Sequence, residues 1–136
     1  GENNPDLVID FATLTGAARI ALGAELPAAY GGDAALIAQL AGQGAALADP
    51  LWPMPLWDGY EDELSSRIAD LNNCPSGGLG GSITAALFLR RFVADPARWI
   101  HLDLYAWNGR ERPGRPVGAE AQCVRAVAGL LLQRYR

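Results

Sequence analysis

The sequence predicts an α/β domain in which strands are layered against helices. Two observations support this prediction. Strand patterns and helix patterns alternate along the chain, and half of the 136 residues are hydrophobic, which is enough for one compact domain with a single core. No internal repeat divides the sequence, so we expect one domain over residues 1–136.

Three segments have the pattern of strands. Residues 6–12 (DLVIDFA) form a short, nearly uninterrupted apolar run, which predicts a buried strand. Residues 26–30 predict a shorter strand that stops at two glycines, and residues 99–106 (WIHLDLYA) predict another buried strand. Three strands make a small sheet for a sequence of which half is hydrophobic, and no predicted element precedes the first strand. The chain therefore looks like part of a larger domain.

Four segments have the pattern of helices. The first is capped by Asp33 and runs to about residue 47, and a shorter helix is expected near residues 60–68. Ser82 is expected to cap a helix over residues 83–94, which is apolar on most of its circumference and so should lie between layers. A final helix is expected from about Ala119. The expected inward faces are Leu36, Ile37, Leu40 and Leu47 in the first helix, and Val124, Val127, Ala128, Leu131, Leu132 and Tyr135 in the last.

Proline and glycine mark the segments between these elements. Residues 49–60 (DPLWPMPLWDGY) carry three prolines and two tryptophans, which excludes a regular helix or a central strand and predicts an ordered, aromatic-anchored surface segment. Residues 72–82 (NNCPSGGLGGS) and 107–118 (WNGRERPGRPVG) predict loops.

Composition and charge exclude several classes of function. The net charge of −4 offers no basic surface for nucleic acid, and no apolar run approaches the roughly 20 residues that cross a membrane. The N-terminal GENNPD has no signal-peptide pattern, and two distant cysteines make no disulfide framework. We therefore expect a soluble protein of a reducing cytoplasm, without nucleic acid or membrane as partner. Every basic residue is arginine except one histidine, so these residues cannot carry lysine-based catalysis.

The end of the first strand is the main candidate site. In DFATLTGAAR, residues 10–19, the apolar run ends in a short T-L-T-G loop. Strand ends of α/β sheets face the crevice in which ligands bind, and Gly16 would allow a ligand to approach the backbone closely. The alternative is that Thr13 and Thr15 only complete a turn and that Gly16 supplies a special dihedral angle.

Other conspicuous residues have a structural and a functional interpretation. His101 and Asp103 point to the same face of a strand and could be two metal ligands, but no third ligand is evident, so we favour a buried, hydrogen-bonded histidine. GGLGGS, residues 77–82, precedes a helix as an anion-binding loop does, yet it lacks the lysine of a P-loop. We interpret it as a flexible loop near the mouth of the site. Cys74 has no base partner in sequence and is interpreted as a small loop residue.

Two further groups of residues are interpreted through their charge or size. Three arginines of the loop at 107–118 form either a solvated loop or ion pairs with acidic residues of a neighbouring subunit. The four tryptophans are expected to anchor the core or an interface. The arginines are Arg110, Arg112 and Arg115, and the tryptophans are Trp52, Trp57, Trp99 and Trp107.

Several blocks of the sequence resemble one family. NPDLVIDFATLTGAARIALG is similar to the segment of the leucyl (cytosol) aminopeptidases that follows their metal-binding motif, and T-L-T-G is its most specific element. The resemblance covers almost the whole chain, and YAWNGRERPGRPVGAEAQ looks like a proteobacterial branch of the family. It continues through LWPMPLWDGY, SSRIADLNN, GGSITAALFLRRFV and WIHLDL.

The resemblance implies the fold and the activity of a parent protein. It implies the three-layer, mixed-sheet α/β fold of the aminopeptidase catalytic domain, with only the C-terminal portion present in residues 1–136. The parent would be a hexameric, cytoplasmic, bacterial metalloprotease that uses two divalent ions, Mn or Zn, to hydrolyse N-terminal residues from peptides. The family's N-T-D-A-E-G-R ligand motif and its lysines have no counterpart here. We therefore expect no catalytic residue, no metal ligand and no cofactor in this chain, and an inactive isolated chain.

The resemblance also implies residues that bind the peptide substrate. Thr13, Leu14 and Gly16 would line the pocket for the N-terminal residue, with the Leu14 carbonyl accepting a hydrogen bond from the peptide and the Gly16 amide donating one. Tyr105 stands where many members have a small alanine in the floor of that pocket. A phenol there would shrink or reshape the pocket, so we expect a preference for a smaller or otherwise different N-terminal residue.

Two other classes of function stay open from the sequence. One is a non-catalytic assembly or interaction module with the same fold. The other is a nucleotide-binding α/β domain that uses GGLGGS.

Overall fold

Strands and helices alternate along the chain, as the sequence predicts. The structure is a computed structural model that describes residues 4–136. None of its helices is both long enough and apolar enough to cross a bilayer. The elements are β1 (Val8–Ala12), α1 (Gly16–Leu22), β2 (Ala28–Gly31), α2 (Ala34–Ala46), β3 (Trp52–Pro53), the 3₁₀ helix η1 (Asp58–Leu64), α3 (Gly81–Arg90), the 3₁₀ helix η2 (Pro96–Arg98), β4 (Trp99–Asp103), β5 (Trp107–Asn108), β6 (Gly118–Ala119) and α4 (Val124–Arg134).

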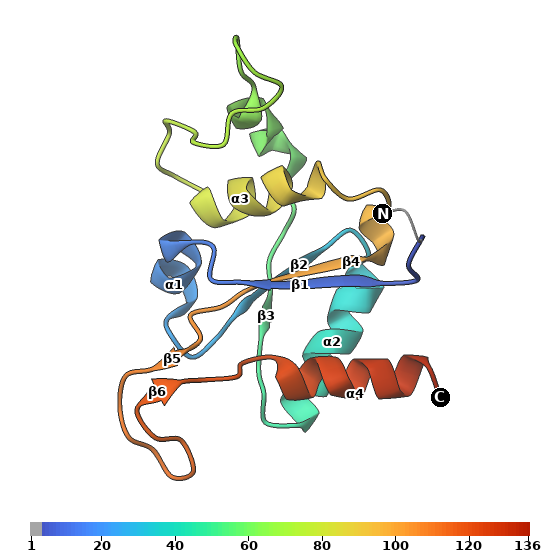
Figure 1. The fold of residues 1–136 in the computed structure, drawn as a ribbon, viewed down its shortest axis with the longest axis vertical. Coiled ribbons are helices and arrows are strands. Elements are labelled where there is room, and N and C mark those ends of the chain that lie inside the picture. Colours follow the sequence, from blue (N-terminus) through green and yellow to red (C-terminus); the bar gives the residue numbers. More distant parts are fainter. Residues whose placement is uncertain (1–3) are drawn as a thin grey trace.

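Four strands form one mixed sheet in the order β1-β4-β2-β3 (Figure 1). β4 runs parallel to β1 and antiparallel to β2, while β3 runs parallel to β2. All five residues of β4 are buried, because β4 has a strand on each side and helices above and below. A separate two-stranded ribbon, β5-β6, follows the sheet.

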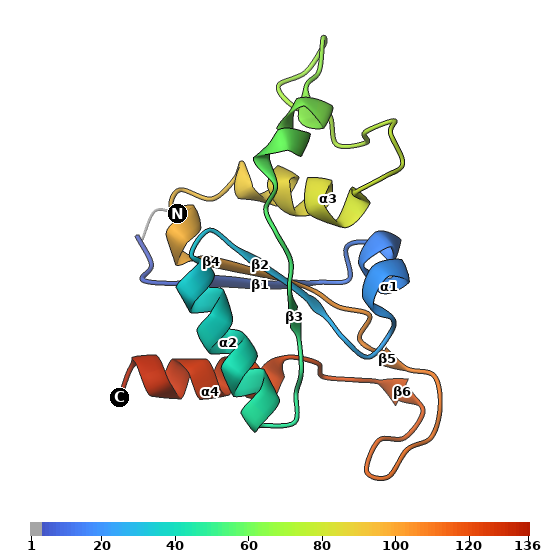
Figure 2. The same cartoon turned by 180° about the vertical axis from the view of Figure 1, so that it is seen from behind.

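Helices cover both faces of the sheet and complete three layers. In Figure 1, α3 lies on one side of the strands, and α2 and α4 lie on the other. Figure 2 shows α2 and α4 side by side from behind. The core on the α2 and α4 side contains Ala29, Leu36, Ile37, Leu40, Leu51, Ile100, Leu102, Cys123, Ala126, Val127 and Leu130. The core on the α1 and α3 side contains Ala18, Ala28, Tyr30 and Ala86. The predicted α/β fold with a mixed sheet is confirmed.

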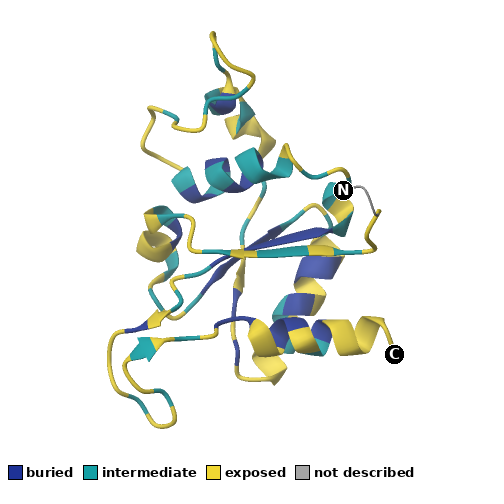
Figure 3. Ribbon diagram, viewed as in Figure 1, coloured by how far each residue is buried: buried dark blue, intermediate teal, exposed yellow. Residues whose placement is uncertain are grey.

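β1 is an edge strand, and the expectation of a buried strand is wrong for these residues. Val8 is 38% exposed and Phe11 is 44% exposed. The physical reason is that β1 pairs with β4 alone within the described residues, so one of its edges has no neighbour (Figure 3).

α2 begins as the sequence predicts. The Asp33 carboxylate accepts hydrogen bonds from the amides of Ala35 and Leu36, at 2.8 and 3.3 Å, and so caps the helix. Three of the four expected inward residues are buried. Leu47 is instead the C-terminal cap and is exposed, because the helix ends before it can turn that side chain inward.

The segment after α2 is ordered but differs from the prediction. The short β3 adds to β2 through two backbone hydrogen bonds, from Trp52 to Pro27 and from Met54 to Ala29. Its tryptophans do not anchor it, because Trp52 and Trp57 are both exposed. The expected helix at residues 60–68 is a 3₁₀ helix, η1, that ends at Leu64 and buries only that side chain.

α3 has no side-chain cap, so the predicted role of Ser82 is wrong. The cap position is Gly80, in the left-handed conformation with φ of 65°, which glycine adopts easily. Ser82 is buried inside the first turn, and its hydroxyl forms a 2.5 Å hydrogen bond with the Tyr30 hydroxyl. The helix ends at Arg90, and Phe92 beyond it is exposed.

α4 starts later than predicted, at Val124, and buries a different face. Asp49 accepts hydrogen bonds from the amides of Cys123, Arg125 and Ala126, at 3.0, 2.8 and 3.1 Å, and so fixes the start of the helix. Its buried residues are Ala126, Val127 and Leu130. Of the expected inward stripe only Val127 is buried, while Val124, Ala128, Leu131, Leu132 and Tyr135 face outward.

Candidate functional site

The T-L-T-G loop joins β1 to α1 and is held by a carboxylate from the neighbouring strand. Asp103, the last residue of β4, accepts hydrogen bonds from the amides of Leu14 and Thr15, at 3.0 and 3.2 Å. Its second oxygen accepts from the Thr15 hydroxyl at 2.7 Å. The Thr15 hydroxyl oxygen also accepts from the Ala18 amide at 3.0 Å and thereby caps α1. The turn interpretation of Thr15 is therefore correct, and Asp103 fixes the whole loop.

This arrangement leaves main-chain groups of the loop free. Within residues 4–136, no hydrogen bond reaches the Leu14 carbonyl or the Gly16 amide. Thr13, Leu14 and Gly16 are exposed, and a Cβ at Gly16 would meet no atom within 4 Å. A ligand can thus approach this stretch of backbone, and it would meet groups whose positions are already fixed.

The loop borders an apolar hollow of the surface, called here the large hollow. Its volume is about 410 Å³, and Leu14 and Thr15 form one wall. Helix α3 supplies apolar side chains to the opposite side, and the loop at residues 72–82 supplies residues that include Asn73, Cys74 and Gly78. The interpretation of that loop as a neighbour of the site agrees with this placement.

Tyr105 lies on the other side of Thr15. It lines a much smaller hollow of about 10 Å³ together with Thr15 and Asp103. The Arg19 guanidinium stacks on its ring, 4.9 Å from the centroid, which fixes the ring by a cation–π contact. The structure therefore brings Tyr105 to Thr15, whereas neither hollow includes Thr13 or Gly16.

His101 is buried in a polar layer on the same face of the sheet. Its Nδ1 lies 2.5 Å from an oxygen of Asp10, the residue opposite it on β1, so the ring donates to that carboxylate. The other Asp10 oxygen accepts from the Trp99 indole at 2.7 Å. The imidazole is stacked between the rings of Tyr30 and Trp99, at 5.9 and 6.1 Å. This is the hydrogen-bonded core histidine that we favoured.

His101 and Asp103 share a face but serve different partners. His101 bonds to Asp10, whereas Asp103 bonds to the T-L-T-G loop. In the part of the chain that the structure describes, no group of three or more His, Cys, Asp or Glu side chains converges on one point. The described residues therefore do not form a ligand set for a metal ion.

Burial raises the pKa of two groups, one in the core on each face of the sheet. The pKa of Tyr30 rises to about 12, chiefly because burial disfavours the phenolate, against a smaller opposing effect of the Ser82 hydrogen bond. The pKa of the Cys123 thiol also rises to about 12, through burial and the nearby Asp49 carboxylate. Both groups are therefore neutral at physiological pH and are not activated nucleophiles.

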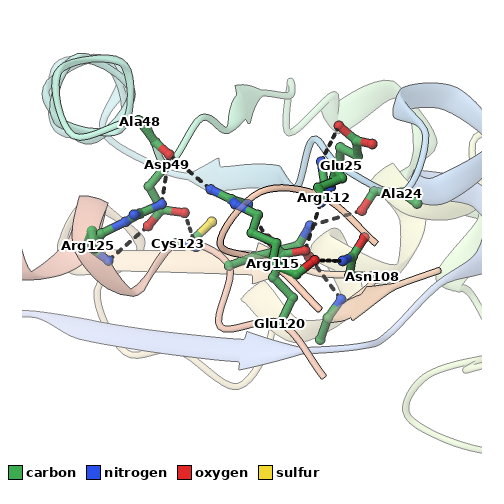
Figure 4. A network of polar contacts seen from close by, with 12 residues as sticks. Ala24, Glu25, Ala48, Asp49, Asn108, Arg112, Arg115, Glu120, Cys123 and Arg125 are labelled. Carbon is green, nitrogen blue, oxygen red and sulfur yellow. Dashed lines mark hydrogen bonds and ion pairs between the residues drawn. The ribbon is translucent and has the colours of Figure 1, made fainter. Parts of the chain in front are cut away.

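The arginines of the 107–118 loop pair within the chain. Arg112 bridges Glu25 and Glu120, at 2.8 and 3.1 Å, and Arg115 also binds Glu120 (Figure 4). Arg110 reaches Glu25 at 3.1 Å. The contacts with Glu25 tie the loop to the segment between α1 and β2, so the cluster stabilises the chain itself. Of the four tryptophans only Trp99 is a core residue here, because Trp52, Trp57 and Trp107 are exposed.

The fold and the loop together define an α/β domain in which a hydrogen-bonded loop with free backbone groups lies at the carboxyl end of two parallel strands. The sequence matches the cytosol aminopeptidase family, catalytic domain, over residues 1–128. The chain belongs to this family, and it forms part of the family's catalytic domain.

Individual relatives agree with this assignment. A probable cytosol aminopeptidase of Geobacter sulfurreducens is 45% identical over 97% of the chain, and one of Acidovorax ebreus is 48% identical over 84%. The crystal structure of the cytosol aminopeptidase from Coxiella burnetii, 49% identical, superposes with a TM-score of 0.93 over 99% of the chain and 30% of that protein. The bottromycin maturation enzyme BotP in complex with Mn, 34% identical, has a TM-score of 0.90 over 96% of the chain and 29% of that protein. The chain spans about a quarter of the length of the curated relatives, 27% for the Geobacter protein.

Proposed function

We propose that this chain is the C-terminal, substrate-lining portion of the catalytic domain of a metal-dependent aminopeptidase. The observation that supports it best is the fixed T-L-T-G loop. Asp103 forms hydrogen bonds with the Leu14 amide and with the Thr15 hydroxyl, while the Leu14 carbonyl and the Gly16 amide stay free. One free acceptor and one free donor, two residues apart on the main chain, can pair with the backbone of a peptide that lies beside them.

The proposed role of these groups is to position the peptide. The Leu14 carbonyl accepts from a peptide N–H, and the Gly16 amide donates to a peptide carbonyl. Because the loop is fixed before the substrate arrives, little conformational entropy is lost on binding. Thr13 and Leu14 flank the N-terminal residue, with Tyr105 as the floor of its pocket.

The metal ions of such an enzyme would be held elsewhere. In the described residues, Asp10, Asp103 and His101 are hydrogen-bonded to structural partners, and no ligand set converges. The chain alone is therefore proposed to be inactive. The parent enzyme is proposed to bind two divalent cations, Mn or Zn, through residues outside this chain, and to act on peptides as a cytoplasmic hexamer.

Tyr105 supports the proposal that the parent enzyme prefers a narrower range of N-terminal residues in its peptide substrates. Its ring is held by Arg19 and closes the small hollow beside Thr15. We therefore expect a preference for small N-terminal residues. Faster hydrolysis of leucine and phenylalanine amides than of alanine and glycine amides would contradict this part of the proposal.

The test compares this chain with the product of its whole gene. Both are assayed on a panel of aminoacyl amides with added manganese or zinc. We expect hydrolysis by the whole product only, and its loss with a chelator. Turnover by the 136-residue chain would contradict the proposal.

A pair of variants of the whole gene product tests the role of the Gly16 amide. Gly16→Pro removes the donor, and proline fits there because Gly16 is the first residue of α1 and Thr15 before it is extended, with φ of −130° and ψ of 140°. Gly16→Ala keeps the donor and measures the effect of side-chain bulk alone. We expect kcat/KM of Gly16→Pro to fall about tenfold below that of Gly16→Ala, as for the loss of one positioned hydrogen bond. Equal activities would exclude the amide as a donor.

The two alternative functions have less support. A nucleotide phosphate at the start of α3 would lie beside the Glu63 carboxylate, which lines the same hollow and repels anions. An assembly module would not require a loop with a fixed, exposed donor and acceptor.

A further inference from the structure

The large hollow beside the T-L-T-G loop is mostly apolar and contains one charged residue. Its volume is about 410 Å³, and side chains such as Leu64, Leu79, Phe88 and Leu89 supply much of its lining. Glu63 is the only charged residue among those that line it in the described part of the chain. A hollow of this kind fits a long aliphatic group that ends in a positive charge.

Glu63 has no counter-ion of its own. Its Oε2 is buried without a hydrogen-bond partner, and neither of its carboxylate oxygens forms a hydrogen bond or an ion pair with residues 4–136. The neighbouring acidic residues do have partners, because Arg90 pairs with both Asp58 and Glu61. A carboxylate that is partly withdrawn from water without a partner costs free energy, and a cationic ligand would remove that cost.

Small residues lie beside the Glu63 carboxylate. The neighbouring loop is rich in glycine, and a Cβ at Gly77 would lie 3.6 Å from Oε2, in ordinary van der Waals contact. The approach to the carboxylate is therefore bounded by small residues of one loop.

We propose that this hollow binds the side chain of a lysine or arginine in the peptide, with Glu63 as its counter-ion. The aliphatic stem packs against the leucines and Phe88, and the charged end meets the carboxylate. An aliphatic side chain without charge would fill the hollow but leave Glu63 unpaired. An acidic side chain would be repelled.

The position of this residue in the peptide follows from the proposed function, on which the inference depends. The N-terminal residue is placed on the Tyr105 side of the loop, and the large hollow shares only Thr15 with the small hollow there. The large hollow therefore takes the second residue, directly after the bond that is cut.

The experiment uses the product of the whole gene and four dipeptides with the same N-terminal residue: Ala-Lys, Ala-Arg, Ala-norleucine and Ala-Glu. Norleucine has the aliphatic stem of lysine without its charge. We expect kcat/KM for Ala-Lys and Ala-Arg to exceed that for Ala-norleucine about tenfold, a typical effect of one charge-assisted contact. Glu63→Gln should abolish this preference, so that kcat/KM for Ala-Lys and Ala-Arg falls to about that for Ala-norleucine with the same variant. Glu111→Gln is the matched control, because Glu111 is exposed and lines no part of this hollow.

The outcomes separate this inference from the proposed function. Hydrolysis of all four dipeptides without preference for Lys or Arg would overturn the inference and leave the aminopeptidase proposal intact. A preference that survives Glu63→Gln, or one seen only for an N-terminal lysine as in Lys-Ala, would also overturn it. If no aminoacyl amide or dipeptide is cut, both proposals fail.

Discussion

The carboxylate of Asp103 should be the main determinant of the loop that we propose as the substrate site. Asp103→Asn keeps the size of the side chain and an oxygen that can accept from the Leu14 and Thr15 amides. It removes the negative charge and the acceptor for the Thr15 hydroxyl, which is now bonded at 2.7 Å. The loss of charge weakens each of the two amide bonds by about 0.5–1 kcal/mol, and the lost hydroxyl bond adds about 1 kcal/mol. The expected total is about 2–3 kcal/mol.

Thermal and urea unfolding measure this loss. For a chain of this size, about 2–3 kcal/mol lowers the melting temperature by roughly 6–9 °C. The matched control is Asp33→Asn, because Asp33 also accepts from two backbone amides but acts as an N-terminal cap, where asparagine performs equally well. We expect that control to change stability by less than about 0.5 kcal/mol.

Equal, small losses for the two variants would refute the reasoning. They would mean that the Asp103 bonds do not hold the loop. In the whole gene product, Asp103→Asn should also lower kcat/KM for aminoacyl amides, because the free carbonyl and amide of the loop lose their fixed positions.

Three further predictions concern stability. Gly44→Ala should destabilise the chain by about 2 kcal/mol, because its Cβ would lie 2.7 Å from a backbone carbonyl oxygen, whereas Gly42→Ala in the same helix meets no atom and should stabilise it by about 0.5–1 kcal/mol in urea unfolding. Thr15→Ala should cost about 2 kcal/mol through the loss of two hydrogen bonds, and Thr15→Ser should restore most of it. The raised pKa values of Cys123 and Tyr30, both about 12, contribute stability that is complete below their ordinary values of 9 and 10 and is lost as the pH rises toward 12. Unfolding followed from pH 7 to 10 should therefore show a loss of about 1–2 kcal/mol, and Cys123→Ala should remove most of that slope; a flat profile in the unchanged chain would contradict this prediction.

Local patterns were enough to predict the order of the main elements. The apolar runs at β1 and β4 and the Asp33 cap of α2 are determined by residues close in sequence. The first residues of α3 and α4 were predicted wrongly, because they depend on contacts with residues far away in the sequence. α4 starts where Asp49 meets its amides, more than 70 positions away, and Ser82 is drawn inward by Tyr30. No pattern within a single segment contains these contacts.

The candidate site divides in the same way. The T-L-T-G loop can be recognised from its sequence, but the residue that fixes it cannot, because Asp103 is 88 positions from Thr15 and reaches it only through the pairing of β1 with β4. No sequence pattern marks Glu63 as a candidate site residue. Glu63 stands out because it lacks a counter-ion within the described residues. Only the structure shows this, since it places the nearby Arg90 against Asp58 and Glu61 instead.

β1 carries a conflict between its sequence pattern and its burial. A nearly uninterrupted apolar run indicates a strand that is covered on both faces and paired on both edges. Within residues 4–136, β1 has a single neighbour, and Phe11 remains 44% exposed. The curated relatives are nearly four times as long as this chain, so their additional residues can supply what this strand lacks. The T-L-T-G loop at the end of the same strand also has free backbone groups, so within residues 4–136 both the strand edge and the loop can accept a further partner.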